Sequence, residues 1–168
     1  SIAQMSDPGP AFYVMVVLST TIAAFGLLAD STAVVIGAML VAPLMGPIFG
    51  MALGVTVNDR KLFTDATIGE VFGAALVVVL AGGIATLFPH AEFGREILSR
   101  TEPNLYDLVV AFASGLAGAY ALVDRRLSPA LPGVAIATAL VPPLTASGLC
   151  FAEGHTQQGI GALLLFVA

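Results

Sequence analysis

Two pairs of prolines lie inside long apolar stretches and are the first candidates for chemistry. Pro43 and Pro47 interrupt one stretch, and the adjacent Pro142 and Pro143 interrupt a later one. Proline inside a helix removes a backbone hydrogen bond and clashes with the preceding turn, at a cost of about 3 kcal/mol or more. A helix broken there exposes carbonyls and amides that carry partial charges of about half an electron. Two breaks that meet near the middle of a membrane would form a site for an ion or a polar solute.

Small and hydroxyl-bearing residues at these breaks, and on two other stretches, are expected to line that substrate or ion path. They are Pro43, Gly46, Pro47, Thr138, Pro142, Pro143, Thr145 and Ser147, with Thr20 and Ser114 from the other stretches. The alternative is that the prolines only bend helices and that each hydroxyl bonds to the preceding turn of its own helix.

Three acidic residues in or near apolar stretches are possible proton or cation sites, because an acid inside a membrane is costly and usually functional. Glu70 is the deepest of them, about 9 Å along a helix from Thr64. Asp30 and Asp107 are the others, and each also suits the capping of a helix end at the membrane surface.

Nothing in the sequence indicates an enzyme. It contains no nucleophile paired with a base, no phosphate-binding glycine loop and no metalloprotease helix motif. The single cysteine, Cys150, lies in an apolar stretch and cannot form a cysteine metal site. The net charge of -5 is dispersed, without a basic patch. We therefore predict no catalytic residues, no metal, no cofactor and no nucleic-acid partner.

The elements that must position these residues follow from composition. Of 168 residues, 58% are hydrophobic and 10% are charged, and the mean hydropathy is +0.98. Soluble domains carry about 25% charged residues, and a chain of this size has too little interior to hide so much apolar surface from water. The lipid bilayer is therefore the expected solvent.

The few charges divide the chain into six apolar stretches of 15 to 28 residues. A bilayer core about 30 Å thick needs about 20 residues of helix, and a helix satisfies its backbone polar groups internally. The sequence predicts one all-α integral membrane domain over 1–168, with an extramembrane segment at 88–104. The six helices are expected at about 13–29, 31–57, 65–87, 105–123 and 131–152, and from 158 to a truncated end at Ala168.

An internal repeat relates the two proline-containing stretches. A shift of one hundred residues sets 31–54 beside 131–154 and pairs Pro43 with Pro143. Repeat one would cover about 11–87 and repeat two about 105–168. Because each repeat holds three helices, the second must enter the membrane from the opposite side, as in many secondary transporters. The alternative is that apolar helices match by composition alone.

Basic residues in short loops predict the orientation. Arg60 and Lys61 follow the second expected helix, and Arg125 and Arg126 follow the fourth, so both loops are expected in the cytoplasm. The amino terminus is then inside. The turn at Asp30 and the segments 90–104 and 153–155 would face outward.

A stripe of small residues is formed by Gly46, Gly50 and Gly54. Such stripes let helices approach closely within a membrane. We expect this one to serve helix packing or contact between subunits of a homo-oligomer.

Two runs resemble a known family. The run GLLADSTAVVIGAMLVAPLMGPI at 26–48 and the later run ALVPPL at 139–144 are similar to the prokaryotic hydrophobic membrane proteins called domain of unknown function three hundred and eighty-nine. The resemblance implies a multi-pass protein of the bacterial or archaeal cytoplasmic membrane, often with additional soluble sequence. It implies no activity.

The leading hypothesis is a transporter-like protein that moves a small solute or ion through a site between two broken helices. The alternatives are an ion channel, or a membrane scaffold or sensor that transports nothing and whose soluble part is absent here. A water-accessible polar cavity at Pro43 and Pro143 would favour transport, whereas tightly packed apolar contacts there would refute it.

Overall fold

The computed structural model describes residues 9–88, 93–102, 104–123 and 140–167, and every regular element within these ranges is an α-helix. The all-α prediction is therefore confirmed for the described residues. The helices are α2 (Pro10–Leu28), α3 (Thr32–Val41), α4 (Met45–Thr56), α5 (Arg60–Leu87), α6 (Arg95–Leu98), α7 (Leu105–Val123), α9 (Val141–Ala152) and α10 (Thr156–Val167).

Most expected helices have a counterpart. The predictions at 13–29, 65–87 and 105–123 correspond to α2, α5 and α7, and the one at 31–57 is formed by α3 and α4 together. The extramembrane segment contains the four-residue helix α6. Of the stretch 131–152, only the part that forms α9 can be described, since 131–139 lies outside the described residues.

Two helices, α2 and α5, are long and apolar enough to cross a membrane, and α3 with α4 raises the number to three if that bent pair is one span. The other apolar helices are shorter, at Leu105–Tyr120, Val141–Ala152 and Thr156–Val167. The described residues thus contain two or three candidate spans where the sequence predicted six.

Three helix pairs are joined by the same three-residue turn: α2 to α3, α4 to α5, and α9 to α10. The middle residue of each turn has a positive φ, 50° at Asp30, 54° at Asn58 and 79° at Gly154. In each turn the next amide donates to the carbonyl five residues earlier, which is the Schellman arrangement that ends a helix and reverses the chain. These bonds are 2.9 Å long and join Ser31 to Gly26, Asp59 to Gly54, and His155 to Cys150.

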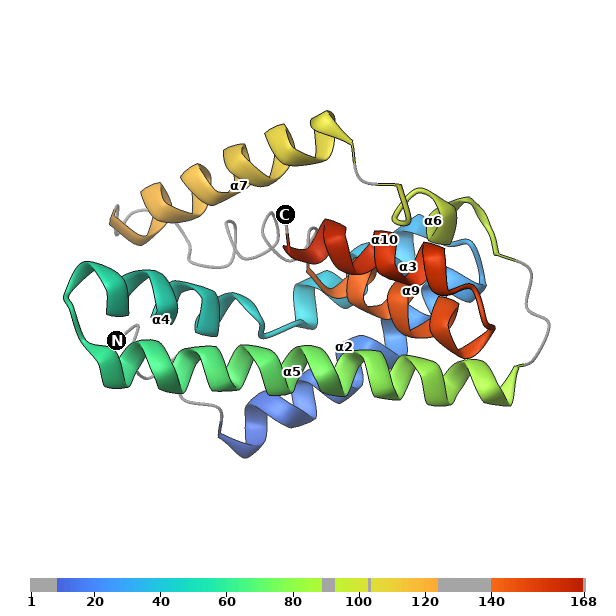
Figure 1. The fold of residues 1–168 in the computed structure, drawn as a ribbon, viewed down its shortest axis with the longest axis horizontal. Helices are drawn as coiled ribbons and strands as arrows, with labels where there is room; N and C mark the ends of the chain where they lie inside the picture. The colour runs from blue at the N-terminus through green and yellow to red at the C-terminus, as the bar shows by residue number, and fades with distance from the viewer. Residues whose placement is uncertain (1–8, 89–92, 103, 124–139, 168) are drawn as a thin grey trace.

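The longest helix, α5, organises the packing (Figure 1). Its 28 residues extend over about 42 Å. Helices α4 and α9 lie along different parts of α5, α2 crosses it, and α10 covers α9. By contrast, α7 lies at the edge of the fold and makes few contacts with the other described helices (Figure 1).

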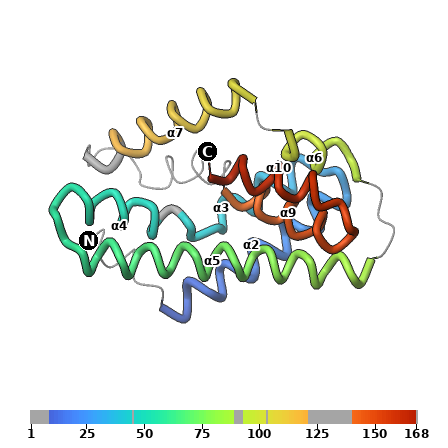
Figure 2. Tube along the Cα trace, in the orientation of Figure 1, coloured from blue at the N-terminus to red at the C-terminus, as the bar shows by residue number. Residues whose placement is uncertain are grey.

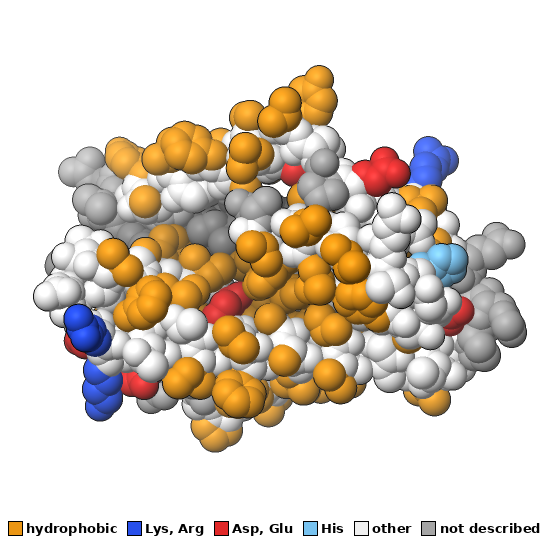
Figure 3. Space-filling model, viewed as in Figure 1, with side chains coloured by type: hydrophobic (Ala, Val, Ile, Leu, Met, Phe, Trp, Pro, Cys, Tyr) orange, Lys and Arg blue, Asp and Glu red, His pale blue; other side chains and the backbone are white. Residues whose placement is uncertain are grey.

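Charged side chains lie toward the ends of the molecule. Figure 3 shows Lys and Arg at the two ends of the viewed face and hydrophobic side chains between them, with one small acidic area inside the hydrophobic surface. At one end, the Asp30 carboxylate accepts a hydrogen bond of 2.8 Å from the Glu96 amide, and the Phe93 and His155 rings lie 5.0 Å apart. The three segments expected on one side of a membrane therefore meet, at the end of α5 opposite Arg60.

Candidate functional site

The first proline segment separates two helices. Helix α3 ends at Val41, Ala42 is extended, and α4 begins at Met45. Pro43 lies outside both helices, and its carbonyl accepts a hydrogen bond of 3.3 Å from the Gly46 amide. The two helix axes differ by 50°, and the bend can be followed in the chain trace (Figure 2). Pro43 therefore lies in the break between α3 and α4 and not inside either helix.

The second proline segment begins a helix. Val141 is the first residue of α9, and Pro142 and Pro143 follow in its first turn. Amides in the first turn have no acceptor within the helix, so proline is tolerated there without loss of a hydrogen bond. A break of helix five at these prolines was predicted, and its preceding half, 131–139, lies outside the described residues.

The beginnings of α4 and α9 meet in one buried cluster, which we call the helix junction. Its members come from both helix starts and from α2, α3 and α5. They are Phe12, Val16, Ala23, Ala38, Leu44, Val77, Leu140, Val141 and Leu144. All of these side chains are apolar, so the junction is closely packed where the transport hypothesis expected a polar, water-accessible cavity.

Helices α4 and α9 occupy matching positions, but at a shift other than one hundred. Each has 12 residues, and α9 begins ninety-six residues after α4, Val141 against Met45, and ends ninety-six after it, Ala152 against Thr56. The turns that follow are also ninety-six residues apart. At this shift Pro47, rather than Pro43, corresponds to Pro143, and both lie in the first turn of a helix.

The expected hydroxyls do not gather around a common point. Thr20 donates to the Val16 carbonyl at 2.7 Å, and Thr145 donates to the Val141 carbonyl at 2.8 Å. These are the bonds to the preceding turn that formed the alternative interpretation. The Ser147 hydroxyl is fully buried and has no partner among the described residues.

Two further hydroxyls complete the predicted set. Ser114 lies on α7, half-buried and away from the junction. Thr138 lies outside the described residues.

Glu70 is the acid that the structure places inside the bundle. It is 7% exposed, and neither carboxyl oxygen has a hydrogen-bond partner within the described ranges. It shares the buried face of α5 with Gly73 and Val77. A Cβ on Gly73 would lie 3.1 Å from side-chain atoms of both Leu44 and Phe12, so this face of α5 is turned toward the helix junction.

Asp30 and Asp107 have structural contacts instead. Asp30 accepts from the Glu96 amide in the first turn of α6. Asp107 accepts from the Asn104 amide at 2.9 Å, while the Asn104 side chain accepts from the Tyr106 and Asp107 amides. This reciprocal pair is a capping box that closes the start of α7. The capping role weighed for both acids therefore matches their contacts.

The three stripe glycines are buried within the chain. Gly46, Gly50 and Gly54 all face the interior, and a Cβ on Gly54 would lie 2.7 Å from the Phe63 amide of α5. Contact between α4 and α5 depends on this small face, because a larger residue would push the helices apart.

The sequence did not predict a polar network at the α6 end. Thr32 donates to the Glu96 carboxylate, which pairs with Arg100 at 3.3 Å. Burial lowers the pKa of the Arg100 guanidinium, and the carboxylates of Glu96 and Asp107 oppose that shift. The four-residue spacing of Glu96 and Arg100 was the only available signal, since Thr32 is sixty-four residues away from Glu96.

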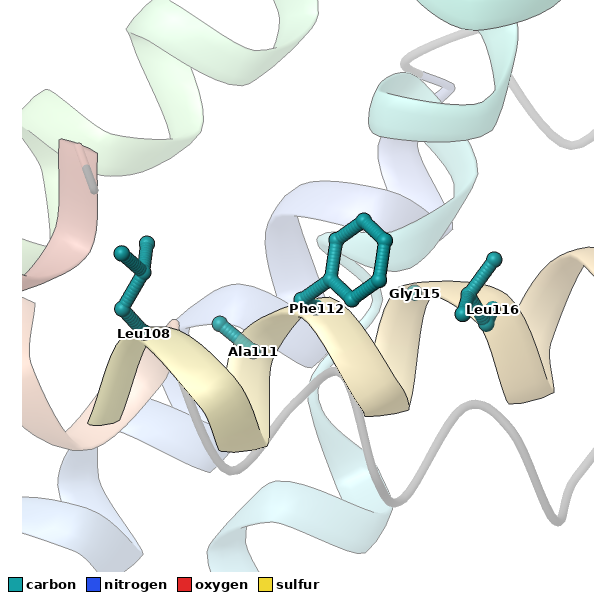
Figure 4. Close-up of a pocket in the computed structure, with 5 residues that line it drawn as sticks. All are labelled: Leu108, Ala111, Phe112, Gly115 and Leu116. Carbon is teal, nitrogen blue, oxygen red and sulfur yellow. The ribbon is translucent and has the colours of Figure 1, made fainter. Parts of the chain in front are cut away.

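Two pockets lie away from the junction. A pocket of about 420 Å³ is formed by one face of α7, where Leu108, Phe112 and Leu116 project in the same direction (Figure 4). Another, of about 370 Å³, lies at the turn between α4 and α5, beside Asp59, Arg60 and Phe63. The first is apolar and exposed, and neither contains Glu70.

Comparisons with known proteins agree on one group. Residues 39–168 match the family described as Domain of unknown function (DUF389). An uncharacterized protein of the archaeon Methanocaldococcus jannaschii is 33% identical over 153 residues, which cover 91% of this chain and 48% of that relative. The chain thus spans about half the length of the curated relative that it matches. No solved structure matches the chain.

Proposed function

The chain belongs to the family described as Domain of unknown function (DUF389), as its run at 26–48 predicted, and from this premise we propose that it is the membrane domain of a transporter. It would move a small solute or ion across the cytoplasmic membrane of a prokaryote, through a path that opens at the helix junction. The full six-helix, inverted arrangement and the inward amino terminus belong to this proposal.

The observation that carries the proposal is that α4 and α9, helices of equal length in matching positions, begin in the same buried cluster. Pro47, Pro142 and Pro143 have no amide hydrogen, and the Gly46 amide donates to the Pro43 carbonyl, so these helix starts would act mainly through their partial positive charge. In transporters built from repeats, discontinuous helices in corresponding positions form the substrate site near the membrane midplane. The correspondence of Pro47 with Pro143 at the shift of ninety-six residues is what favours a repeat, since the same turn also follows α2.

The packing found at the junction is the outcome expected in the absence of an open path, so the transport proposal requires that this structure is a closed state. Leu44, Val141 and Leu144 are each 1% exposed, so a solute can pass only if the α4 start and the α9 start separate. Both starts lack the full set of hydrogen bonds that holds a helix interior. Separating the two helix starts therefore costs less free energy than unwinding the middle of α5 would.

The test is flux through liposomes that contain the full chain, read with trapped indicator dyes for H⁺, Na⁺ and K⁺ against protein-free liposomes. In a Cys150→Ser background, Leu44→Cys with Val141→Cys would be joined by a short thiol cross-linker. We expect flux in the uncross-linked protein, loss on cross-linking, and no loss in the single-cysteine controls. Unchanged flux after cross-linking would show that the path lies elsewhere.

The alternatives make different predictions in the same assay. If the flux does not saturate as the concentration of the transported ion rises, a channel is favoured over a carrier. Complete absence of flux for these ions would favour a scaffold or sensor.

Association of copies is also part of the proposal. Because Gly54 already packs against Phe63 within one chain, the glycine stripe is used internally. Exposed apolar side chains on α2, α5 and α7 remain for contact with lipid or with a second copy.

A further inference from the structure

The carboxyl group of Glu70 is buried without compensation. Its residue is 7% exposed, and both oxygens lack a hydrogen-bond partner within the described part of the chain. An ionised carboxylate without a partner is strongly disfavoured in an apolar interior, and such a group becomes neutral instead. Glu70 therefore has a physical reason to hold a proton.

The described helices that pack against α5 supply no opposite charge. Helices α2, α4 and α9 pack against α5, and none of the three contains Lys, Arg, Asp or Glu. Their titratable side chains are Tyr13 on α2 and Cys150 on α9. On α5, the nearest charged residue is Asp65, which is exposed and, five residues earlier, lies on another face of the helix.

The depth of Glu70 suits an intramembrane site. It lies ten residues after Arg60, the first residue of α5, which is about 15 Å along a helix of about 42 Å. A hydrocarbon core is about 30 Å thick. With α5 centred in the membrane, the carboxyl lies inside that core, on the face turned toward the helix junction.

We propose that Glu70 is a proton-binding site and that the proton is the ion coupled to transport. A proton from water on one side forms an O–H bond with a carboxylate oxygen. The neutral carboxyl is then compatible with the closed, apolar junction. When the junction opens to the other side, that O–H bond breaks, the proton returns to water, and the carboxylate remains. This coupling rests on the proposed function, whereas proton binding by Glu70 can be tested without it.

The surroundings favour a proton over a metal ion. The described residues contain no group of three His, Cys, Asp or Glu side chains able to hold a metal. Ca²⁺ takes six to eight oxygen ligands, and Mg²⁺ demands an octahedral set. One carboxylate beside Ala66, Gly69 and Gly73 supplies too few.

Infrared spectra of the full chain in detergent micelles, taken as differences between the wild type and each variant, test directly whether the Glu70 carboxyl is protonated. At about pH 7, exposed glutamates, whose pKa is about 4.3, are ionised. We expect a neutral-carboxyl band in the wild type, its loss in Glu70→Gln, and its retention in the matched control Glu102→Gln, whose glutamate is exposed. Absence of the band in the wild type, or its persistence in Glu70→Gln, would overturn the proposal.

A second variant covers the case in which Glu70→Gln fails to fold, as judged by circular dichroism. Glu70→Asp keeps the carboxyl and should move the band to a new frequency. An unmoved band in Glu70→Asp would assign it to another residue and overturn the proposal.

Flux measurements in liposomes distinguish the proton site at Glu70 from the transport proposal. With a pH gradient imposed, we expect flux in the wild type to follow the gradient and Glu70→Gln to lose that dependence. Gradient-independent flux without a neutral carboxyl would overturn the proton site and leave transport standing. A neutral carboxyl without any flux would overturn transport and leave the proton site standing.

Discussion

Helices α9 and α7 are both apolar, yet they occupy opposite environments. Ten consecutive residues of α9, from Val141 to Cys150, are buried. In α7 the large side chains face outward: Phe112 is 70% exposed, and Tyr106 is 82% exposed. Both helices contain small residues: Pro, Ala, Ser, Gly or Thr stands at seven of the 12 positions of α9, and Ala, Gly or Ser at eight of the 19 positions of α7.

Under the proposed membrane location, this difference concerns which helix lies inside the bundle. An apolar side chain gains little by leaving lipid for the bundle, so close backbone approach decides which helix lies inside. Gly148 illustrates the point, because its backbone lies directly against Val78 and Gly82 of α5. The contacts of the small residues, such as Gly148, therefore distinguish the buried helix, whereas their number in the sequence does not.

The largest contrast is expected from removing a leucine in each helix. Leu149→Ala in α9, where the side chain is fully buried, should lower the free energy of unfolding by about 2–5 kcal/mol, because it leaves a cavity. Leu116→Ala in α7, where the side chain is 57% exposed, should change it by no more than about 0.5 kcal/mol. Unfolding in mixed micelles measures both, and equal losses would refute the contrast.

A smaller contrast comes from adding one methyl group. A Cβ on Gly148 would lie 2.5 Å from the Val78 carbonyl oxygen, whereas a Cβ on Gly115 in α7 meets nothing within 4 Å. Gly148→Ala should cost about 1–3 kcal/mol through overpacking. Gly115→Ala should stabilise by up to about 1 kcal/mol, since alanine favours a helix. Thermal unfolding of the two variants provides the measurement, and a stable Gly148→Ala protein would contradict the close contact.

The capping residues of α7 and α5 should also differ in their effect on stability. Because α7 has few tertiary contacts, Asn104→Ala should destabilise its first turn by about 1 kcal/mol and speed amide exchange there. Asp59 caps α5 through the amides of Lys61 and Leu62, but packing also holds that helix. Asp59→Ala should therefore raise the amide exchange rate in the first turn of α5 less than Asn104→Ala raises it in α7. Hydrogen-exchange mass spectrometry measures both rates. A larger effect at α5 would argue against this account.

Only a small effect on stability is expected at Ser147. Its hydroxyl is buried without a partner in the described residues, so Ser147→Ala removes an unsatisfied group and should change the free energy of unfolding by less than about 1 kcal/mol. Equilibrium unfolding beside the wild type is the check. A loss of more than about 2 kcal/mol would mean that the hydroxyl has a bonding partner.

The helices themselves were largely predictable from local signals. Long charge-free stretches indicated α2, α5 and α7, and the Asp30 turn separated α2 from α3. The number of spans, the register between α4 and α9, and the contacts of the hydroxyls were not. The one-hundred-residue shift matched prolines by identity, whereas Pro47 and Pro143 correspond by their place in a helix.

The candidate site was predicted in part. Pro43 and Pro143 do mark helix ends near a common cluster, but the cluster is apolar, and Thr20 and Thr145 bond to their own helices. Glu70 was proposed from its depth alone. No pattern in the sequence could show that its oxygens would be left without partners.

By itself, the sequence determined the helical class, the approximate positions of the helices and the family, because charge and proline act over a few neighbouring positions. Only the tertiary structure decided that α9 is inside and α7 outside, that the starts of α4 and α9 share one cluster, and that the helices described as packing against α5 offer Glu70 no counter-charge. Those features depend on contacts between residues far apart in the chain. In lipid, they are set by how closely helices can approach, and hydrophobicity alone does not encode that.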